Sequence, residues 1–297
     1  MEENVAPYVS VIIPTLHREE PLRQVLKYFL DSESYSPFEV IVVDQSDRHE
    51  PATVEYLASI NDRIRLVQIT KRGAANARNH GARMARGSLL LFVDDDDLPR
   101  ANFIRGHVGA HQDSGIAAVC GAVLRPGNRL RTREELTSEE LATIRLHRGG
   151  LRDVDFPFEC SWGSTSNLSV KAEWFSKVGG FYSHENAGVA SGGLNDALFG
   201  HVLRHRGGRI LYSPLPAIVI GRAETGGCRD LVDSGQRRVL ELENALNFWA
   251  RIGNSRVRAI QTTFRRLVIR RSIPQTATNL WAFVKALARW SLTTRVE

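Results

Sequence analysis

The stretch that decides the fold runs from Lys71 to Asp97 and has the sequence KRGAANARNHGARMARGSLLLFVDDDD. It ends in the apolar run 89–93, which is followed directly by four aspartates. A short apolar run that ends in charge predicts a strand buried in a parallel sheet. Because like charges repel, four carboxylates at the end of such a strand call for a cation. In open α/β sheets, ligands bind outside the carboxyl ends of the strands, so we expect a ligand site here.

The acidic turn predicts a divalent metal site. Hard oxygen ligands suit Mg²⁺ or Mn²⁺ bound together with a substrate phosphate. The alanine-rich segment 74–85 favours a helix leading into the strand, which places Arg78 beside the turn, where a diphosphate would bridge both. A solvated acidic turn is the simpler interpretation of the aspartates. For Arg78, phosphate binding and a solvated helix surface both stay open.

The bulk composition predicts an ordinary globular protein. The chain has 297 residues, of which 42% are hydrophobic and 24% are charged, enough for one large α/β domain with an appendage. No apolar run approaches the roughly 20 residues that span a bilayer, and the acidic N-terminus lacks the basic region of a signal peptide. Cys120, Cys160 and Cys228 form neither a disulfide framework nor a zinc set. We therefore expect a cytoplasmic protein that is not secreted and has no transmembrane helix.

The net charge of +6 is unevenly distributed. From Arg229 onward the chain has thirteen Lys and Arg against five Asp and Glu, whereas the rest has 26 basic and 28 acidic residues. The basic character therefore belongs to the tail, which must have its own explanation. We divide the chain into a domain at 1–228, with halves at 8–124 and 125–228, and a basic amphipathic helical tail at 229–297.

Strand and helix patterns alternate along the first half. Apolar β-branched runs predict strands at 9–13, 38–43 and 64–69, and the spacing of apolar residues predicts helices from Pro21 onward and at 53–60. This alternation favours a parallel sheet with right-handed crossovers. Asp44 ends the second strand, where it is either a turn residue or a hydrogen-bond acceptor for a nucleotide base.

Several motifs, in order, resemble one family. VSVIIPT, VIVVDQSD and the opening stretch are similar to the nucleotide-binding half of GT-A glycosyltransferases of family 2, the large inverting family that includes cellulose and chitin synthases. GSTSNLSV, VGGF, GGLND and ILYSP resemble its acceptor half, so the likeness covers roughly residues 8–222. The resemblance implies a GT-A fold, which is Rossmann-like with a mostly parallel central sheet flanked by helices. The tail would be a C-terminal helical extension.

The same resemblance implies roles for individual residues. Asp196 takes the place of the catalytic base, and Asp94 and Asp96 take the place of the metal-binding DxD pair. The residues implied in donor binding are Pro14, Thr15, Asp44, Arg78, Asp94 and Asp95, and those implied on the acceptor side are Trp162, Asn167 and Asn195. A metal held by carboxylates offsets charge on the leaving diphosphate, and a carboxylate across the sugar takes the proton of the acceptor hydroxyl.

This sequence departs from the family pattern at three places. Asn195 stands where the family has Glu, and the segment 182–185 replaces a usual Asp-Glu after GGF. Arg222 falls where many relatives have a His near the metal. Without that His, metal binding would rest on aspartates, phosphates and water.

The polar insertion at 125–155 contains seven arginines and a capping box formed by Thr137 and Glu140, which predicts a helix through about residue 147. It is either a solvated surface helix or an acceptor-side flap that recognises a phosphate or lipid diphosphate. The neighbouring Phe156, Phe158 and Trp162 suit a sugar-stacking groove or the core.

His107 and His111 have i, i+4 spacing but no third ligand nearby, so we expect them on a helix surface. In the tail, apolar residues at helical spacing alternate with arginines. Such helices suit an anionic membrane surface, and packing on the domain or on a second subunit is the alternative. Nucleic acid is the least favoured partner, because no nucleic-acid-binding module is present.

The sequence thus predicts a metal-dependent inverting hexosyltransferase. It would move a sugar from a UDP- or dTDP-linked donor to a hydroxyl of a glycan or lipid-linked acceptor in cell-surface polysaccharide synthesis, at the cytosolic face of the membrane. One alternative is a phosphotransferase of the haloacid dehalogenase type. In that type the DxD motif follows the first strand, whereas Asp94 of this chain follows the fourth. The other is a nucleotide-sugar-binding scaffold without catalysis, which Asn195 favours.

Overall fold

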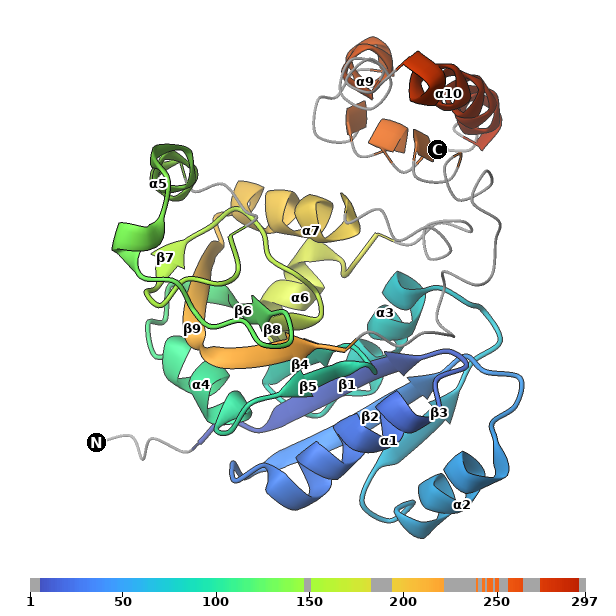
Figure 1. Cartoon of the computed structure of the whole chain (residues 1–297). Helices are drawn as coiled ribbons and strands as arrows, with labels where there is room; N and C mark the ends of the chain where they lie inside the picture. The colour runs from blue at the N-terminus through green and yellow to red at the C-terminus, as the bar shows by residue number, and fades with distance from the viewer. Residues whose placement is uncertain are drawn as a thin grey trace.

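The computed structural model describes residues 6–146, 151–182, 194–221, 239, 242–243, 245–247, 249–250, 256–263 and 273–293. A nine-stranded sheet forms the centre of the described chain and has helices on both faces (Figure 1). Its path runs in the order β3-β2-β1-β4-β8-β6-β9-β5, and β7 pairs with β9 outside this path.

The first half is the parallel part of the sheet. Its strands are β1 (Val9–Thr15), β2 (Phe38–Asp44), β3 (Arg65–Gln68) and β4 (Leu89–Val93), and every pair among them is parallel. The helices between them are α1 (Glu20–Lys27), continued by a π-helical turn at Tyr28–Ser32, α2 (Pro51–Ser59) and α3 (Ala74–Met84). These elements confirm the alternation predicted from the sequence.

The part of the chain from residue 97 onward mixes strand directions. Its strands are β5 (Asp97–Pro99), β6 (Ile116–Leu124), β7 (Phe158–Glu159), β8 (Asn167–Lys171) and β9 (Arg209–Ile220). Strand β8 runs antiparallel to both β4 and β6, and β5 and β7 run antiparallel to β9, so the parallel sheet predicted from the first half does not continue here. The helices are α4 (Phe103–Ala110), α5 (Ser138–Arg145), α6 (Ala172–Val178) and α7 (Leu194–His205), with a 3₁₀ turn at Arg133–Glu135. Thr137 and Glu140 form the predicted capping box of α5.

Two apolar cores lie on opposite faces of the sheet. Along β1, Val11 and Ile13 belong to the core that includes α1 and α4, whereas Ile12 belongs to the core that includes α6 and α7. This alternation follows from the two-residue period of a strand. Helix α3 lies very close to β1, because a Cβ added at Gly81 would stand 2.5 Å from a methyl group of Ile12. That close packing fixes the position of α3 beside the end of β4.

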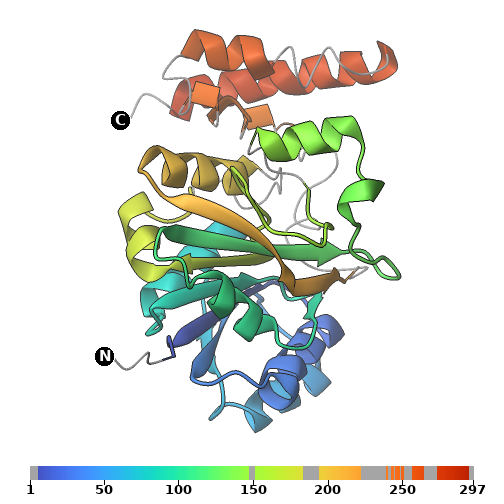
Figure 2. The same ribbon diagram turned by 90° about the vertical axis from the view of Figure 1, so that its left-hand side faces the viewer.

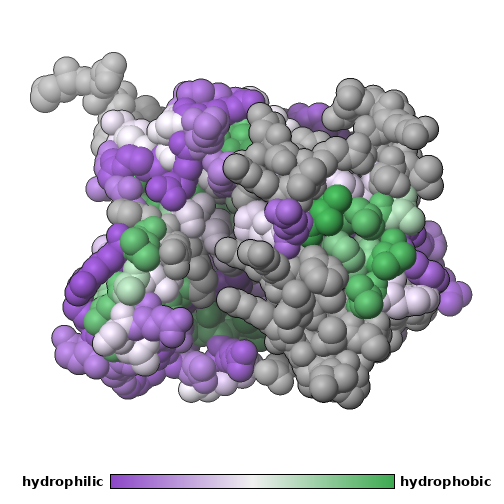
Figure 3. Space-filling view, turned by 90° about the horizontal axis from the view of Figure 1, so that it is seen from above, coloured by the Kyte–Doolittle hydropathy of each residue, from purple (hydrophilic) through white to green (hydrophobic). Residues whose placement is uncertain are grey.

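The tail helices α9 (Arg256–Thr263) and α10 (Ile273–Thr293) share a small core of their own, in which Trp290 is buried. Figures 1 and 2 place both helices beyond α7, on its side away from the sheet. The opposite face of α10 exposes Leu280, Trp281 and Val284, and Figure 3 shows hydrophobic residues gathered over this part of the surface. Within the described part of the chain, no helix has the length and apolar character needed to cross a bilayer. The predicted boundary at residues 228 and 229 lies outside the described residues.

Candidate active site at the carboxyl ends of the parallel strands

The predicted donor residues meet at one edge of the sheet. Thr15 and Asp44 end the neighbouring strands β1 and β2, where they are register partners. Asp94 begins the turn after β4, the other neighbour of β1. Because all three strands are parallel, their carboxyl ends bring these residues together, as the sequence predicts.

Arg78 of α3 forms an ion pair with the first carboxylate of the turn. Its Nη2 lies 2.5 Å from Oδ1 of Asp94, and the guanidinium is largely buried. The helix brings Arg78 to this place because Gly81, one turn later, allows α3 to lie directly on β1. A cation fixed beside the acidic turn is suited to the phosphates of a diphosphate ligand.

A second arginine, which the sequence analysis missed, binds the middle of the acidic turn. Arg18 lies 3.3 Å from Oδ2 of Asp96 through its Nη2 and 3.7 Å from Oδ1 of Asp95 through its Nε. The hydroxyl of Thr15 donates to Oδ2 of Asp95 at 2.7 Å. Burial raises the pKa of Asp95 to about 7, against the opposing effects of Thr15 and Arg18. Thr15 and Asp95 are therefore buried residues that position the turn, and Pro14, which is also buried, directly precedes Thr15.

The end of the turn is fixed by β9. The backbone N–H of Gly221 donates to Oδ1 of Asp97 at 3.2 Å, and Ser166 hydrogen-bonds the same carboxyl group. Burial, together with the charges of Asp94 and Asp96, raises the pKa of Asp97 to about 8. A Cβ at Gly221 would stand 1.5 Å from the carbonyl oxygen of Asp96, so only glycine fits at this contact.

Asp44 is held in place by His49, a partner that the sequence did not reveal. Nε2 of His49 lies 3.1 Å from Oδ2 of Asp44, and its Nδ1 lies 3.1 Å from Oε1 of Glu19. Burial alone would raise the pKa of Asp44, but hydrogen bonds from His49 and Ser46 outweigh it and lower the pKa. The Asp44 hydrogen bond is the main cause that raises the pKa of His49.

The predicted base, Asp196, lies in the first turn of α7 and is held by Thr165. The Thr165 hydroxyl donates to Oδ1 of Asp196 at 3.0 Å, and its backbone N–H donates to Oδ2 at 3.3 Å. Burial raises the pKa of Asp196, whereas the Arg78 charge and the Thr165 hydrogen bonds oppose that rise. Ser166, which directly follows Thr165, hydrogen-bonds Asp97, so neighbouring residues hold the predicted base and the acidic turn.

Asn167 was predicted as an acceptor contact, and the structure argues against that role. Its side chain is fully buried, and its Nδ2 donates to the carbonyl oxygens of Ala122 and Pro216, each at 2.8 Å. Its Oδ1 lies 2.8 Å from Nε2 of His107. With its hydrogen-bonding groups occupied inside the protein, Asn167 holds β8 against β6 and β9.

The expected surface position of His107 is wrong. Its ring is fully buried and joins Asn167 to Ser169, whose hydroxyl also lies 2.9 Å from Nε2 of His111. Burial lowers the pKa of His107 to about 3 and that of His111 to about 4. The i, i+4 spacing of the pair therefore serves a buried hydrogen-bonded chain.

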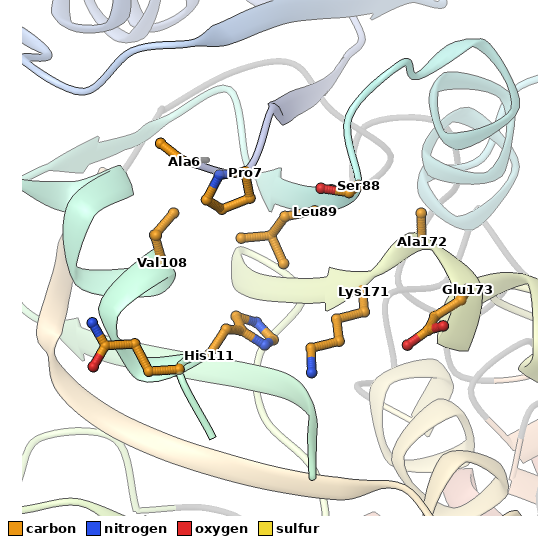
Figure 4. Close-up of a pocket in the computed structure, with 10 residues that line it drawn as sticks. Ala6, Pro7, Ser88, Leu89, Val108, His111, Lys171, Ala172 and Glu173 are labelled. Carbon is orange, nitrogen blue, oxygen red and sulfur yellow. The ribbon is translucent and has the colours of Figure 1, made fainter. Parts of the chain in front are cut away.

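A cavity of about 550 Å³ opens at the other end of the sheet. Figure 4 shows Pro7, Leu89 and Val108 on one side of it, with His111 and Lys171 on the other. Leu89 is the first residue of β4, so this cavity lies at the opposite edge from the acidic turn. It is thus separate from the candidate active site.

The other two predicted acceptor residues lie close to Asp196. Asn195 precedes it in α7. Trp162 packs against the same helix, because a Cβ at Gly200 would stand 2.8 Å from Cβ of Trp162. The guanidinium of Arg152 lies 5.5 Å from the centre of the Trp162 ring.

Among the described residues, His, Cys, Asp and Glu side chains do not converge in groups of three or more that would hold a metal alone. Asp94 and Asp96 nevertheless offer hard oxygen atoms from one turn, and both now contact arginines. This donor set suits Mg²⁺ or Mn²⁺ only if phosphate oxygens and water complete the coordination.

Asn79 joins the two halves of the domain. Its Nδ2 donates to the carbonyl oxygen of Phe181 at 2.7 Å, and its Oδ1 accepts from the backbone N–H of the same residue at 2.8 Å. Sequence reasoning placed Asn79 on the helix and could not assign this partner, which is 102 residues away.

The curated proteins that resemble this chain include glycosyltransferases. One curated relative is the validoxylamine A glucosyltransferase of Streptomyces hygroscopicus subsp. limoneus, 30% identical over 201 residues, or 59% of this chain and 44% of the relative. Another is the GalNAc(5)-diNAcBac-PP-undecaprenol beta-1,3-glucosyltransferase of Campylobacter jejuni, 33% identical over 94 residues, or 31% of this chain and 30% of the relative. This chain therefore spans less than half the length of each.

Among solved structures, the mannosyltransferase PcManGT of Pyrobaculum calidifontis, in complex with GDP-Man and Mn²⁺, is similar to this chain with a TM-score of 0.60. The two are 18% identical, and the match covers 99% of this chain and 77% of that protein. The likeness establishes the GT-A fold. The model of the family described as Glycosyl transferase family 2 matches residues 10–175, more than half of the chain. The chain belongs to glycosyltransferase family 2.

Proposed function

We propose that this protein transfers a sugar from a UDP- or dTDP-linked donor to a hydroxyl of a glycan or lipid-linked acceptor, with inversion at the anomeric carbon. The observation that carries the proposal is that two consecutive residues hold the predicted base and the acidic turn, because Thr165 hydrogen-bonds Asp196 and Ser166 hydrogen-bonds Asp97. The proposed base is thus linked through consecutive residues to the turn suited to a metal-bound diphosphate. The names of the two curated relatives support sugar transfer, and one of them names an undecaprenol-linked acceptor.

The proposed reaction is a single displacement. The acceptor oxygen attacks the anomeric carbon while the bond from that carbon to the donor phosphate breaks, and the leaving nucleoside diphosphate takes the electron pair. Asp196 takes the proton of the acceptor hydroxyl. Its pKa, raised by burial, favours this step because a base is most effective when its pKa lies near the working pH.

The remaining residues bind and orient the donor. Asp44, which His49 fixes, would accept a hydrogen bond from the N–H of a uracil or thymine ring, and Arg78 would bind the diphosphate. A divalent cation held by Asp94 and Asp96 would offset the charge of the leaving group. The Mn²⁺ and GDP-Man bound to PcManGT support a divalent cation and a nucleotide-sugar donor.

Two experiments test the proposal. The first is calorimetric titration with UDP, dTDP, GDP and ADP, each with Mn²⁺ and with EDTA. Metal-dependent binding of a uracil or thymine diphosphate supports the donor assignment, and no binding of any nucleotide would contradict it. The second compares Asp196→Asn with the unchanged protein. Donor binding should persist while transfer falls by about 10²- to 10⁴-fold.

Two alternative functions were left open by the sequence, a phosphotransferase and a scaffold without catalysis. The match to family 2 contradicts the phosphotransferase of the haloacid dehalogenase type. A scaffold without catalysis would bind the nucleotide but show no transfer in the unchanged protein, so the second experiment also decides that alternative.

We also propose that α10 contacts an anionic membrane. Its exposed Leu280, Trp281 and Val284 lie in a tail with an excess of eight positive charges, and Lys285 lies 3.9 Å from the centre of the Trp281 ring. Apolar and basic groups together suit such a surface. The protein should sediment with phosphatidylglycerol vesicles and not with phosphatidylcholine vesicles, and Trp281→Gln with Val284→Gln should weaken that binding. Equal vesicle binding by this double variant and by the unchanged protein would overturn the proposed membrane contact.

A further inference from the structure

A second cavity, of about 470 Å³, lies beside the acidic turn. Leu124 and Ile220, the last residues of β6 and β9, line it together with Arg125, Asn128 and Arg152. Ile220 is the register partner of Asp97 in the ladder of β5 and β9. The cavity therefore adjoins the turn that we assign to the metal and donor, on the side of the acceptor half.

The charges around this cavity are unbalanced. Its one lining carboxylate, Asp153, forms two hydrogen bonds of 2.9 Å with Arg131. Arg125 and Arg152 form no ion pair with any residue in the described part of the chain. Two guanidinium groups at a cavity wall that have no ion-pair partner among the described residues are suited to an anion, because their planar forks match phosphate and carboxylate oxygens.

One residue that lines the cavity is linked through Trp162 to the helix that carries the predicted base. Arg152 lies over the ring of Trp162, which packs against Gly200 of α7. Asp196 is one helical turn before Gly200, and both the Asp196 and Arg152 charges act on the buried thiol of Cys120. Arg152, Trp162 and the start of α7 thus form a continuous path from the cavity wall toward Asp196.

We propose that Arg125 and Arg152 form an acceptor subsite that binds a phosphate or carboxylate group of the acceptor while its hydroxyl reaches Asp196. This inference rests on the proposed function and adds the chemical class of the acceptor. The anion would be the phosphate of a lipid carrier or an acidic group of a glycan. A neutral acceptor of the same size would leave the two guanidinium groups without a partner.

The test uses the full chain saturated with UDP and Mn²⁺, so that the donor site is filled. Phenyl phosphate is titrated by calorimetry, and neutral phenyl β-glucoside serves as the matched probe. The double variant R125Q/R152Q should raise the Kd for phenyl phosphate at least tenfold. R145Q removes the same charge from the exposed end of α5 in the same inserted segment, outside the cavity, and should leave that Kd unchanged.

Equal binding of phenyl phosphate to R125Q/R152Q and the unchanged protein would overturn the subsite, as would an equal loss in R145Q or equal binding of the neutral glucoside. Arg125 is exposed, so R125Q alone provides the test if the double variant fails to fold; it should weaken phenyl phosphate binding several-fold. Geranyl diphosphate and methyl glucuronide then distinguish a lipid phosphate from a glycan carboxylate. If UDP does not bind, the proposed function fails, whereas the phenyl phosphate titration without UDP still decides the subsite.

Discussion

Thr165 holds both carboxylate oxygens of Asp196, one through its hydroxyl at 3.0 Å and the other through its backbone N–H at 3.3 Å. These two bonds orient the proposed base and favour its charged form. The first prediction concerns the removal of the Thr165 hydroxyl.

Thr165→Val removes the hydroxyl and keeps the shape of the side chain. Because the Thr165 hydrogen bonds lower the pKa of Asp196, their partial loss should raise it, and less of the base is then charged at a given pH. We expect kcat to fall about tenfold and the acid limb of the pH–rate profile to move to higher pH. The KM for the donor should stay unchanged. A uniform fall in rate at every pH would show that Thr165 does not tune the base.

Arg18→Gln tests the cation that the sequence did not reveal. Removing a largely buried partner of Asp95 and Asp96 leaves their charges uncompensated, so in EDTA we expect a loss of about 3–5 kcal/mol in the free energy of unfolding. Mn²⁺ should restore part of that loss, because it supplies the missing positive charge. Urea unfolding in both buffers measures the effect.

Arg63→Gln is the matched control for Arg18. Arg63 also pairs with a carboxylate, Asp31, but both side chains are exposed. Its replacement should cost less than about 1 kcal/mol, with or without Mn²⁺. Equal losses in the two variants would contradict a special role for Arg18.

Gly180→Ala tests the contact between the two halves of the domain. Gly179 and Gly180 have φ values of +87° and +78°, so alanine is strained at both positions. A Cβ at Gly180 would also stand 2.7 Å from Oδ1 of Asn79, whereas a Cβ at Gly179 would meet nothing within 4 Å. We expect a cost of about 1 kcal/mol for Gly179→Ala and at least about 1 kcal/mol more for Gly180→Ala, since the Asn79 bonds to Phe181 are disturbed. Thermal unfolding of the two variants tests this prediction. Equal losses of stability would show that the added methyl group at Gly180 does not disturb the hydrogen bonds between Asn79 and Phe181.

The buried histidines predict a pH dependence of stability. The pKa of His107 is about 3 in the folded protein and near 6.5 when exposed, so between these values only the unfolded chain binds the proton. Unfolding is then favoured as the pH falls, by about 1.4 kcal/mol per pH unit for this group. His107→Gln should show a shallower loss than the unchanged protein in urea unfolding between pH 6.5 and 4.5.

The comparison between those two proteins is needed because other buried groups act in the opposite direction. Burial raises the pKa values of Asp95 and Asp97, so their contribution to stability is lost as the pH rises. Both aspartates are present in the two proteins, and their effect cancels in the difference. If the free energy of unfolding changed with pH in the same way in His107→Gln and in the unchanged protein, a neutral buried His107 would be contradicted.

Local patterns predicted the first half of the fold well. The strand at Leu89–Val93, the helix that carries Arg78 and the gathering of Asp44 and Asp94 at one edge all follow from the two-residue and 3.6-residue periods and from the geometry of parallel sheets. The strand directions of the second half were not predictable in this way, because antiparallel pairing of β8 depends on contacts between distant segments.

The residues that support the site were harder to foresee than those that form it. Arg18, His49 and Thr165 each bind a predicted site residue, but Thr165 is 31 positions from Asp196, and no local pattern marks the pair. His107 was misjudged because its i, i+4 spacing with His111 fits both a metal site and a surface. Its burial depends on Asn167, which is 60 positions away.

Three consecutive residues before and at the start of β8 serve three different parts of the protein. Thr165 binds the proposed base, Ser166 binds Asp97 of the acidic turn, and Asn167 ties β6 to β9. In evolutionary terms, a mutation in this tripeptide affects the proposed base, the shape of the acidic turn or the packing of the sheet. Selection therefore has little freedom here, and new acceptor preferences are expected to arise instead in the arginine-rich insertion, where side chains change without disturbing the base.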